Sequence, residues 1–446
     1  MAKHSIPEHF LHTVWQEQRS FLRGDLRLAD GSPVSILHAG DFNDHRGGPD
    51  FLNAQIAIDG LALSGDVELH REVRHWSDHS HDDDDRYSKV VLHVVLESGE
   101  DANEHLQVPT LVLRDNLAVT NELLWKQLFE KLYDRAPELK CFPHNLLLPI
   151  KQKHKVVERF GEARLDELIS RYYAATLEEW EQKVYVGLLD ALGYSQNRKA
   201  FKDLAEILTP ATIRKALAEF KDADPQLTME ALFFGTAGLL EQPSNELSTG
   251  SNEHLIDLHS RWQSIQLAVD IPMTLSISDW AFFRIRPLNS PHRRAAAAAV
   301  LASKLFAWGV DSVFSLMTQL SEECNIDHFW ESHTSFKSEL ATPHSLFGKE
   351  RVKAMLLNVA IPSVLARSTS RTQTDIKEMR RIWGEDRSAS SARYLNTIEQ
   401  ELLEGTRIRS VRAEQGALYL QRNYCEQGRC AMCPIGTRLA EKGWTP

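Results

Sequence analysis

The fold is decided by one stretch of the sequence, GPDFLNAQIAIDGLALSGDVELHREVRHW, which runs from Gly48 to Trp76. It contains two runs in which apolar residues alternate with others, FLNAQIAI and LALSGDVELH. The pair Asp59-Gly60 separates the runs, and Asp-Gly between alternating runs is a strong signal for a hairpin turn. The stretch therefore predicts two neighbouring strands of one sheet.

More strands are predicted on both sides of this hairpin. Upstream, DLRLADGSPVSILHAG places two β-prone runs around Asp30-Gly31, and downstream come KVVLHVVLES and VPTLVLRD. Near the start of the chain, IPEHFLHTVWQEQRSFL carries apolar residues at the spacing of an amphipathic helix. With about six strands and a flanking helix, residues 1–118 are predicted to form an α+β domain built on a mixed β-sheet.

The rest of the chain is predicted to be a large α-helical region. From about Asn121 onward, apolar residues recur every three or four positions and no long alternating run appears. A chain of 446 residues is too long for one hydrophobic core, so several domains are expected. Pro, Ser, Asn and Gly cluster in Glu241–Glu253, which gives predicted helical domains over 119–241 and 254–446.

Charge and hydropathy exclude some classes of protein. The net charge of −11 argues against a protein that coats nucleic acid by bulk electrostatics, although a local basic groove is compatible with it. No apolar run approaches the ~20 residues that span a bilayer. The N-terminal segment MAKHSIPEHFLHTVWQEQ also lacks the apolar core of a signal peptide. We therefore expect a cytoplasmic protein with no membrane partner.

Acidic residues and a histidine gather near the ends of the two central strands. Asp50 precedes the first strand. On the second strand, Asp66, Glu68 and His70 share one face, because side chains along a strand alternate. Carboxylates with a neutral imidazole suit a hard cation such as Mg²⁺ or Mn²⁺, which orients a phosphate and activates water. If the strands are adjacent, these four side chains form a divalent metal site.

At these residues the sequence resembles the restriction-endonuclease-like superfamily, whose pattern is Pro-Asp followed, on the next strand, by Asp/Glu-X-Lys. Pro49-Asp50 matches the first half, and Glu68-Leu69-His70 matches the second with a histidine in place of the lysine. The resemblance implies a restriction-endonuclease-like fold and cleavage of DNA or RNA, with Asp50 and Glu68 as metal ligands. It puts His70 in the place of the lysine that positions the attacking water. An acid of the first helix sometimes assists in this superfamily, and the sequence offers Glu8 and Glu17.

The stretch that follows, HREVRHWSDHSHDDDDRY, is rich in histidine and includes four consecutive aspartates. His79 and His81 have the spacing to bind zinc together with His70. Such a site would suit a zinc-dependent hydrolase of a substrate other than nucleic acid. The same stretch is equally typical of a solvated acidic loop. Both interpretations stay open on the sequence.

Three of the five cysteines crowd the C-terminal end of the chain. The segment YCEQGRCAMCPIG contains Cys425, Cys430 and Cys433. A C-X-X-C pair with a third cysteine nearby is a chelating pattern, and the fourth ligand is predicted to be Cys141, with Cys324 and His144 as alternatives. One distant cysteine plus this C-terminal trio resembles the iron-sulfur staples of some recombination-type nucleases, and the trio with its proline also resembles the cluster loop of base-excision glycosylases. We expect an iron-sulfur cluster or a zinc ion with a structural role.

Two arginine-rich stretches are candidates for contact with nucleic acid. FFRIRPLNSPHRR supplies Arg284, Arg286, Arg293 and Arg294, and TRIRSVRAEQGALYLQRNYC supplies Arg407, Arg409, Arg412 and Arg422. Clustered guanidinium groups in loops hold phosphate through paired hydrogen bonds, and the first four are predicted as substrate contacts. Arginines also cap helices and pair with surface acids, which is the alternative.

Over the whole chain, the ordered phrases GPDF, GDVELH, LHVV, EALFFGTAGLL, RIRP, LLNVAIP and a C-terminal YC....CAMC.IG resemble the bacterial domain-of-unknown-function 2851 family. This resemblance covers nearly the entire chain and implies an architecture without a mechanism. The leading hypothesis is a metal-dependent nuclease centred on Asp50, Glu68 and His70, with the helical region gripping the substrate. The alternative is a non-catalytic scaffold whose helices bind a protein or a nucleic acid.

Overall fold

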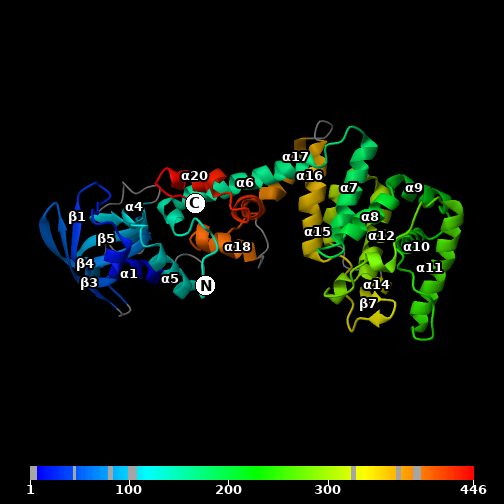
Figure 1. The fold of residues 1–446 in the computed structure, drawn as a ribbon, viewed down its shortest axis with the longest axis horizontal. Coiled ribbons are helices and arrows are strands. Elements are labelled where there is room, and N and C mark those ends of the chain that lie inside the picture. Colours follow the sequence, from blue (N-terminus) through cyan, green and yellow to red (C-terminus); the bar gives the residue numbers. More distant parts are fainter. Residues whose placement is uncertain are drawn as a thin grey trace. The chain divides into compact units, whose positions relative to one another are not determined.

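The computed structural model describes residues 8–43, 47–78, 84–98, 108–322, 328–367, 373–384 and 393–445. The chain divides into two compact units, of which the first contains Met1–Arg164 with Gly384–Pro446 and the second contains Leu165–Trp383 (Figure 1). The predicted boundaries at 119 and 241–254 do not coincide with this division, because the C-terminal segment returns to the N-terminal part and shares a core with it. Local periodicity carries no information about such a return.

The first unit contains a mixed sheet, which confirms the predicted α+β class. Its strands among the described residues are β1 (Val34–His38), β2 (Asp41–Phe42), β3 (Phe51–Ile58), β4 (Leu61–Glu72), β5 (Val90–Glu97) and β6 (Thr110–Val112). Their order is β1-β3-β4-β5-β6, and β2 also pairs with β3. β3 and β4 form the expected antiparallel hairpin, whereas β5 and β6 continue the sheet in parallel. β4 is therefore a central strand.

Helices cover one face of this sheet and form the larger core of the unit. α1 (Glu8–Gln16) and α5 (Glu122–Tyr133) are two of these helices (Figure 1). They contribute Trp15 and Trp125, which pack in one cluster with Val67 and Leu69 of β4. Because side chains alternate, Val95 points to the other face, where it forms a small separate cluster. The remaining short elements of this region are α2 (Gln18–Phe21), α3 (His75–Asp78), η2 (Asp85–Tyr87) and α4 (Leu113–Asn116).

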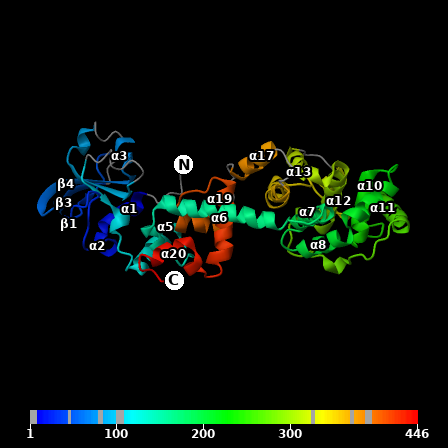
Figure 2. The same ribbon diagram turned by 90° about the horizontal axis from the view of Figure 1, so that it is seen from above.

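A second core of the first unit joins the middle of the chain to its C-terminal end. Its elements are η4 (His144–Leu147), α6 (Ile150–Ser170), α18 (Arg393–Thr397), η10 (Ile398–Leu402), α19 (Val411–Leu420), η11 (Gln421–Cys425), η12 (Cys430–Met432) and α20 (Pro434–Ala440). α6 and α19 lie side by side (Figure 2). Glycine at positions 416 and 161 allows this close approach. A side chain at Gly416 would overlap with the Val157 carbonyl, and one at Gly161 would overlap with the Arg412 carbonyl.

Three charged side chains are buried together in the first unit. Glu404 accepts hydrogen bonds from Arg114 Nη2 over 2.7 Å and from Lys153 Nζ over 2.5 Å. Arg114 also donates to the carbonyls of Leu146 and Leu148. Burial alone would raise the pKa of Glu404, but the two cations lower it to about 2. This buried triad links α4, α6 and the loop after η10.

The second unit is helical apart from one short hairpin among its described residues, β7 (His333–Ser335) with β8 (Ser338–Glu339). Its α-helices are α7 (Leu177–Leu192), α8 (Arg198–Ile207), α9 (Pro210–Glu219), α10 (Pro225–Thr236), α11 (Thr249–Ala268), α12 (Pro291–Trp308), α13 (Val313–Glu322), α14 (His328–Ser332), α15 (Lys349–Met355), α16 (Ile361–Ala366) and α17 (Gln373–Gly384). Shorter 3₁₀ and π segments are η5 (Ile277–Asp279), η6 (Pro287–Asn289), η7 (Val310–Ser312) and η8 (Leu356–Ala360). α10 and α12 are mostly buried, and each begins with a side-chain cap followed by proline, Asp224 and Ser290 being the caps.

Within the described part of the chain, no single helix is both long and apolar enough to cross a bilayer. Two consecutive segments, Pro291–Trp308 and Val310–Leu320, satisfy the requirement only when taken together, and they bend by 110° at the break between them.

Candidate functional site

Asp50 and Glu68 lie side by side where β3 begins next to β4. Phe51 pairs with Val67 across the two strands, which places the residue before Phe51 opposite the residue after Val67. The Asp50 backbone N–H donates to Glu68 Oε2 over 3.1 Å, and the Leu69 backbone N–H donates to Asp50 Oδ2 over 2.9 Å. Each carboxylate is thus held by a backbone amide of the opposite strand region. We call these two residues the acid pair.

Asp66, also predicted as a metal ligand, forms a hydrogen bond that stabilises the β-sheet. Its Oδ1 accepts a hydrogen bond from the Asn53 backbone N–H over 3.1 Å. Asn53 has a positive φ of 59° and lies where the register between β3 and β4 shifts. A bulge of this kind takes an N–H out of the regular ladder, and the Asp66 carboxylate satisfies it. We therefore assign Asp66 to holding the bulge beside the acid pair.

Three histidines surround the acid pair. His12 of α1 places Nε2 at 3.3 Å from Asp50 Oδ1. His70 places Nε2 at 3.4 Å from Glu68 Oε1, and its Nδ1 shares a hydrogen bond of 2.9 Å with Nε2 of His93. His93 stands opposite Glu68 in the parallel pairing of β4 with β5. Sequence reasoning missed His12, for which the one available signal is its place on the helix expected to cover this sheet.

The site has a buried end and a more open end. Glu68 and His70 are only 5% and 1% exposed. The side chains of Asp50 and His12 are 22% and 17% exposed. Glu17, one of the two acids considered as assisting groups, is exposed just beyond α1, whereas the side chain of Glu8 lies outside the described residues. A substrate would therefore reach the acid pair from the side of Asp50.

Two aromatic residues border the buried end. The Trp76 ring lies 5.1 Å from the His93 ring and 6.1 Å from the Tyr87 ring, measured between centroids. Burial first, and then the charge of Glu68, raises the pKa of Tyr87 to about 12. Tyr87 consequently stays protonated at neutral pH and donates its hydroxyl hydrogen bond to the Gly48 carbonyl over 3.3 Å. This bond holds the bend that leads into Asp50.

The acid pair offers part of the ligand set of a divalent cation. Among the residues that the structure describes, no group of three or more His, Cys, Asp or Glu side chains that could hold a metal ion is found. Mg²⁺ does not require such a group, because it is commonly bound by one or two carboxylates and completes its shell with water and substrate phosphate. Zinc needs three or four protein ligands. His79 and His81, which were predicted to join His70 around zinc, lie outside the described residues.

Comparison with known proteins places the chain in a family. A family model described as Protein of unknown function (DUF2851) matches residues 8–387. The chain belongs to the DUF2851 family. No curated protein and no solved structure matches it. The DUF2851 match includes the acid pair and Cys141, and it ends before the three C-terminal cysteines.

Four cysteines of this DUF2851 protein come together in the first unit. Cys141, Cys425, Cys430 and Cys433 line one cavity of about 40 Å³, and none of them forms a disulfide. Burial, followed by the neighbouring sulfurs, raises the pKa of Cys141 to about 12. Of the alternatives for the fourth position, His144 lines a different cavity, and Cys324 lies outside the described residues.

The four arginines predicted as substrate contacts lie in the second unit and are of two kinds. Arg284 and Arg286 are exposed, whereas Arg293 and Arg294 at the start of α12 are buried. The Arg293 guanidinium donates to backbone carbonyls of Trp330, His333, His344 and Ser345. The Arg294 guanidinium donates to the carbonyls of Leu288 and Leu346. Because these donors are used in the protein interior, Arg293 and Arg294 do not reach a substrate, and the prediction is corrected for these two.

A basic groove of about 450 Å³ lies in the first unit. Its cationic residues are Lys155 and Arg159 of α6, Arg412 of α19 and Arg438 of α20. Two acids of α6 also line it, and Arg412 lies within 3.7 Å of both of them. Lys155 and Arg159 are exposed. Of the second arginine-rich stretch, Arg412 lines this groove, while Arg407, Arg409 and Arg422 are exposed elsewhere on these elements.

Proposed function

We propose that this DUF2851 protein is a nuclease that hydrolyses phosphodiester bonds of DNA or RNA with a divalent cation held by Asp50 and Glu68. The observation that supports this proposal is the pair of backbone hydrogen bonds that fixes the two carboxylates side by side. Carboxylates held in this way need little rearrangement to bind a cation. The arrangement agrees with the restriction-endonuclease-like pattern of the sequence around Pro49-Asp50 and Glu68.

The donor atoms of the acid pair suit a hard cation. Each carboxylate uses one oxygen for a backbone amide, and the other oxygen, Asp50 Oδ1 or Glu68 Oε1, lies near an imidazole. One or two carboxylates are the usual protein contribution to Mg²⁺ or Mn²⁺ binding, and water and substrate phosphate complete the shell. When bound, such a cation neutralises charge on the phosphate and lowers the pKa of a water molecule.

The histidines have separate tasks in this proposal. His12 Nε2, which is itself buried, lies 3.3 Å from Asp50 Oδ1, where it can take a proton from the attacking water or give one to the leaving oxygen. His70 is buried between Glu68 and His93 and orients the Glu68 carboxylate. Imidazole both accepts and donates a proton near neutral pH, whereas a lysine would hold a fixed positive charge. The replacement of lysine by histidine therefore changes the proton chemistry and leaves the cation ligands in place.

The basic groove of the first unit supports nucleic acid as the substrate class. It presents four cationic side chains against two carboxylates, and two of the cations, Lys155 and Arg159, are exposed along one helix. Contacts of this kind with phosphate supply most of the sequence-independent affinity of proteins for nucleic acid. The groove offers such contacts even though the whole chain is acidic.

One observation favours a second function, a non-catalytic scaffold that binds nucleic acid or another protein. Glu68 and His70 are almost completely buried, and a buried carboxylate is closed to a substrate phosphate. In a scaffold, the hydrogen bonds of the acid pair would serve only to join β3 to β4. A cleavage experiment separates the two functions, because a scaffold binds without cutting.

The test compares wild type with Asp50→Asn and Glu68→Gln on single-stranded, duplex and branched DNA and RNA, under Mg²⁺ and Mn²⁺. We expect both variants to lose cleavage by on the order of 10²-fold or more, because each removes a charged cation ligand. Asp59→Asn is the matched control, since Asp59 is an exposed acid in the turn at the other end of β3. The proposal fails if the folded wild type cuts nothing on the panel, or if Asp50→Asn cuts as fast as wild type.

A further inference from the structure

The cavity lined by four cysteines is built from two distant segments of the chain. Cys141 lies in the turn before η4. The other three are the last residue of η11, the first residue of η12 and the residue before α20. The cavity volume of about 40 Å³ is roughly three times what one water requires. The rest of its wall is largely apolar and includes Leu139, Tyr424, Ile435 and Trp444. The four cysteines therefore line a space larger than one water molecule.

A single zinc ion and an iron-sulfur cluster require different spacings of four sulfur atoms. A tetrahedral zinc site with Zn–S bonds of about 2.3 Å brings its sulfur atoms to about 3.8 Å from one another. The described residues, which include these four cysteines, contain no group of three or more His, Cys, Asp or Glu side chains that could hold one ion. In an iron-sulfur cluster each sulfur binds a different metal atom, so four cysteines around one shared cavity suit it.

Two of the sulfur atoms have polar N–H groups beside them. The backbone amides of Ile435 and Gly436 lie next to the Cys433 sulfur and favour its thiolate form. The side-chain Nδ2 of Asn145 lies 3.8 Å from Cys141 Sγ and donates to it. Donors to sulfur orient the thiolate ligands of a metal cluster and stabilise their negative charge. Sulfurs that served only to fill a core would have no need of such donors.

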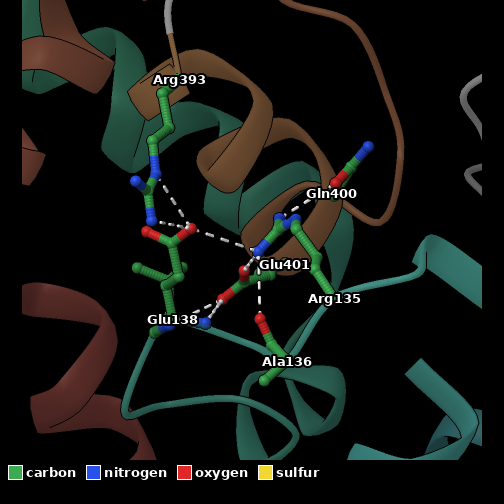
Figure 3. A network of polar contacts seen from close by, with 7 residues as sticks. Arg135, Ala136, Glu138, Arg393, Gln400 and Glu401 are labelled. Atoms are coloured by element: carbon green, nitrogen blue, oxygen red, sulfur yellow. Dashed lines mark hydrogen bonds and ion pairs between the residues drawn. The ribbon is translucent and has the colours of Figure 1, made fainter. Parts of the chain in front are cut away.

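A separate polar network holds the Cys141 segment against the C-terminal helices (Figure 3). Glu401 of η10 accepts hydrogen bonds from the backbone N–H groups of Glu138 and Leu139 over 2.8 and 2.6 Å, and it pairs with Arg135 at 2.6 Å. Arg393 pairs with Glu138 at 3.2 Å on the outer side of the network. These contacts position the segment before Cys141 without help from any metal, so the four cysteines face one cavity in advance.

We propose that Cys141, Cys425, Cys430 and Cys433 bind a [4Fe–4S] cluster, with one cysteine thiolate on each iron. The cluster crosslinks the segment before α6 to the C-terminal end of the chain inside the first unit. Its role is structural, because it joins two distant segments and no residue of the acid pair lines the cavity. The proposal is independent of the proposed nuclease activity, and its readouts are metal content and spectra.

The first experiment measures iron, acid-labile sulfide and zinc in the full chain after anaerobic purification, and again after reconstitution with ferrous iron, sulfide and a thiol reductant. We expect about four iron and four sulfide per chain, a broad visible absorption band and negligible zinc. One zinc per chain without iron would overturn the cluster in favour of a zinc site. A reconstituted chain that binds neither metal would overturn metal binding altogether.

The second experiment tests the ligands one by one. Cys141→Ser should lose most of the iron and the visible absorption, and Cys433→Ser should do the same. Cys324→Ser is the matched control, since it removes a cysteine that is not among the four, and it should keep about four iron per chain. The far-UV circular dichroism of each variant is compared with that of metal-free wild type, which separates lost ligation from misfolding. Full iron content in Cys141→Ser would overturn the assignment of the fourth ligand.

Discussion

The acid pair on the sheet and the four cysteines near the C-terminal end are held in place by different kinds of bond. Asp50 and Glu68 are 18 residues apart, and each carboxylate is fixed by a hydrogen bond from a backbone amide. Cys141 is held opposite the other three by side-chain contacts across the chain, such as the one between Arg135 and Glu401, which are 266 residues apart. The acid pair is partly open to solvent, whereas the cysteine cavity has a largely apolar wall.

Under the proposed function, this difference separates residues that would act on a substrate from residues that stabilise the fold. A carboxylate held by the sheet backbone can lose its charge with little effect on the fold, because strand pairing maintains the local geometry. A contact between segments more than 250 residues apart restricts the chain strongly, so its removal should destabilise the whole first unit. Substitutions at the acid pair should therefore change the rate of cleavage, and substitutions in the long-range networks should change the free energy of unfolding.

The largest effect on stability is expected at Glu404, the centre of the buried triad. Glu404→Gln leaves Lys153 and Arg114 buried without their carboxylate, which should lower the free energy of unfolding by about 3–5 kcal/mol. Urea unfolding followed by circular dichroism measures the change. Glu426→Gln, at an exposed glutamate of the same unit, should stay within about 0.5 kcal/mol of wild type. A loss below about 1 kcal/mol at Glu404 would contradict the role given to the triad.

The same carboxylate should make the first unit sensitive to acid. The pKa of Glu404 falls from an ordinary value of 4.5 to about 2 in the folded chain, so folding favours the ionised form. The contribution of ionised Glu404 to the free energy of unfolding is complete above about pH 4.5 and is lost as the pH falls toward 2. The shift corresponds to on the order of 3 kcal/mol. Unfolding measured between pH 6 and 2 should show a steeper loss in wild type than in Glu404→Gln, and parallel curves would refute this origin of the acid sensitivity.

A site is easier to predict from the sequence when the residues that form it are close together in the sequence. Strand alternation and one Asp-Gly turn were enough to predict that Asp50 and Glu68 belong to neighbouring strands. His12 was not found, because the packing of α1 on the sheet brings it to Asp50 and no local pattern encodes that packing. The parallel pairing that sets His93 opposite Glu68 is also a property of the whole sheet.

The cysteines and the arginines show the two outcomes of reasoning from side-chain chemistry alone. Three closely spaced cysteines imply a fourth ligand, and Cys141, the chosen partner, does line the same cavity. Arg293 and Arg294 stand in a basic stretch, but the sequence does not show that backbone carbonyls of distant loops surround them. The division into two compact units was not predicted for a related reason, since no local sequence pattern encodes the return of residues 384–446 to the first unit.

The smallest effect is expected in the basic groove, and it tests whether the elements around the cysteines also serve the acid pair. Lys155→Ala combined with Arg159→Ala removes two exposed cations of α6 from the groove. If both contact phosphate, nucleic-acid binding should weaken by about 10-fold, and the slope of log affinity against log salt should fall by about 2. Fluorescence anisotropy at several salt concentrations measures both quantities.

The matched control for the groove is Arg393→Ala, which removes an exposed arginine of the first unit that does not line the groove. It should leave the salt slope unchanged. If the double variant binds with the salt slope of wild type, the groove is not a phosphate contact, and the elements around the cysteines serve only the fold. If its slope falls while Arg393→Ala keeps the slope of wild type, α6 belongs to the substrate-binding surface. The acid pair would then serve catalysis and the cysteines would serve stability, while α6, α19 and α20 would both bind the substrate and stabilise the first unit.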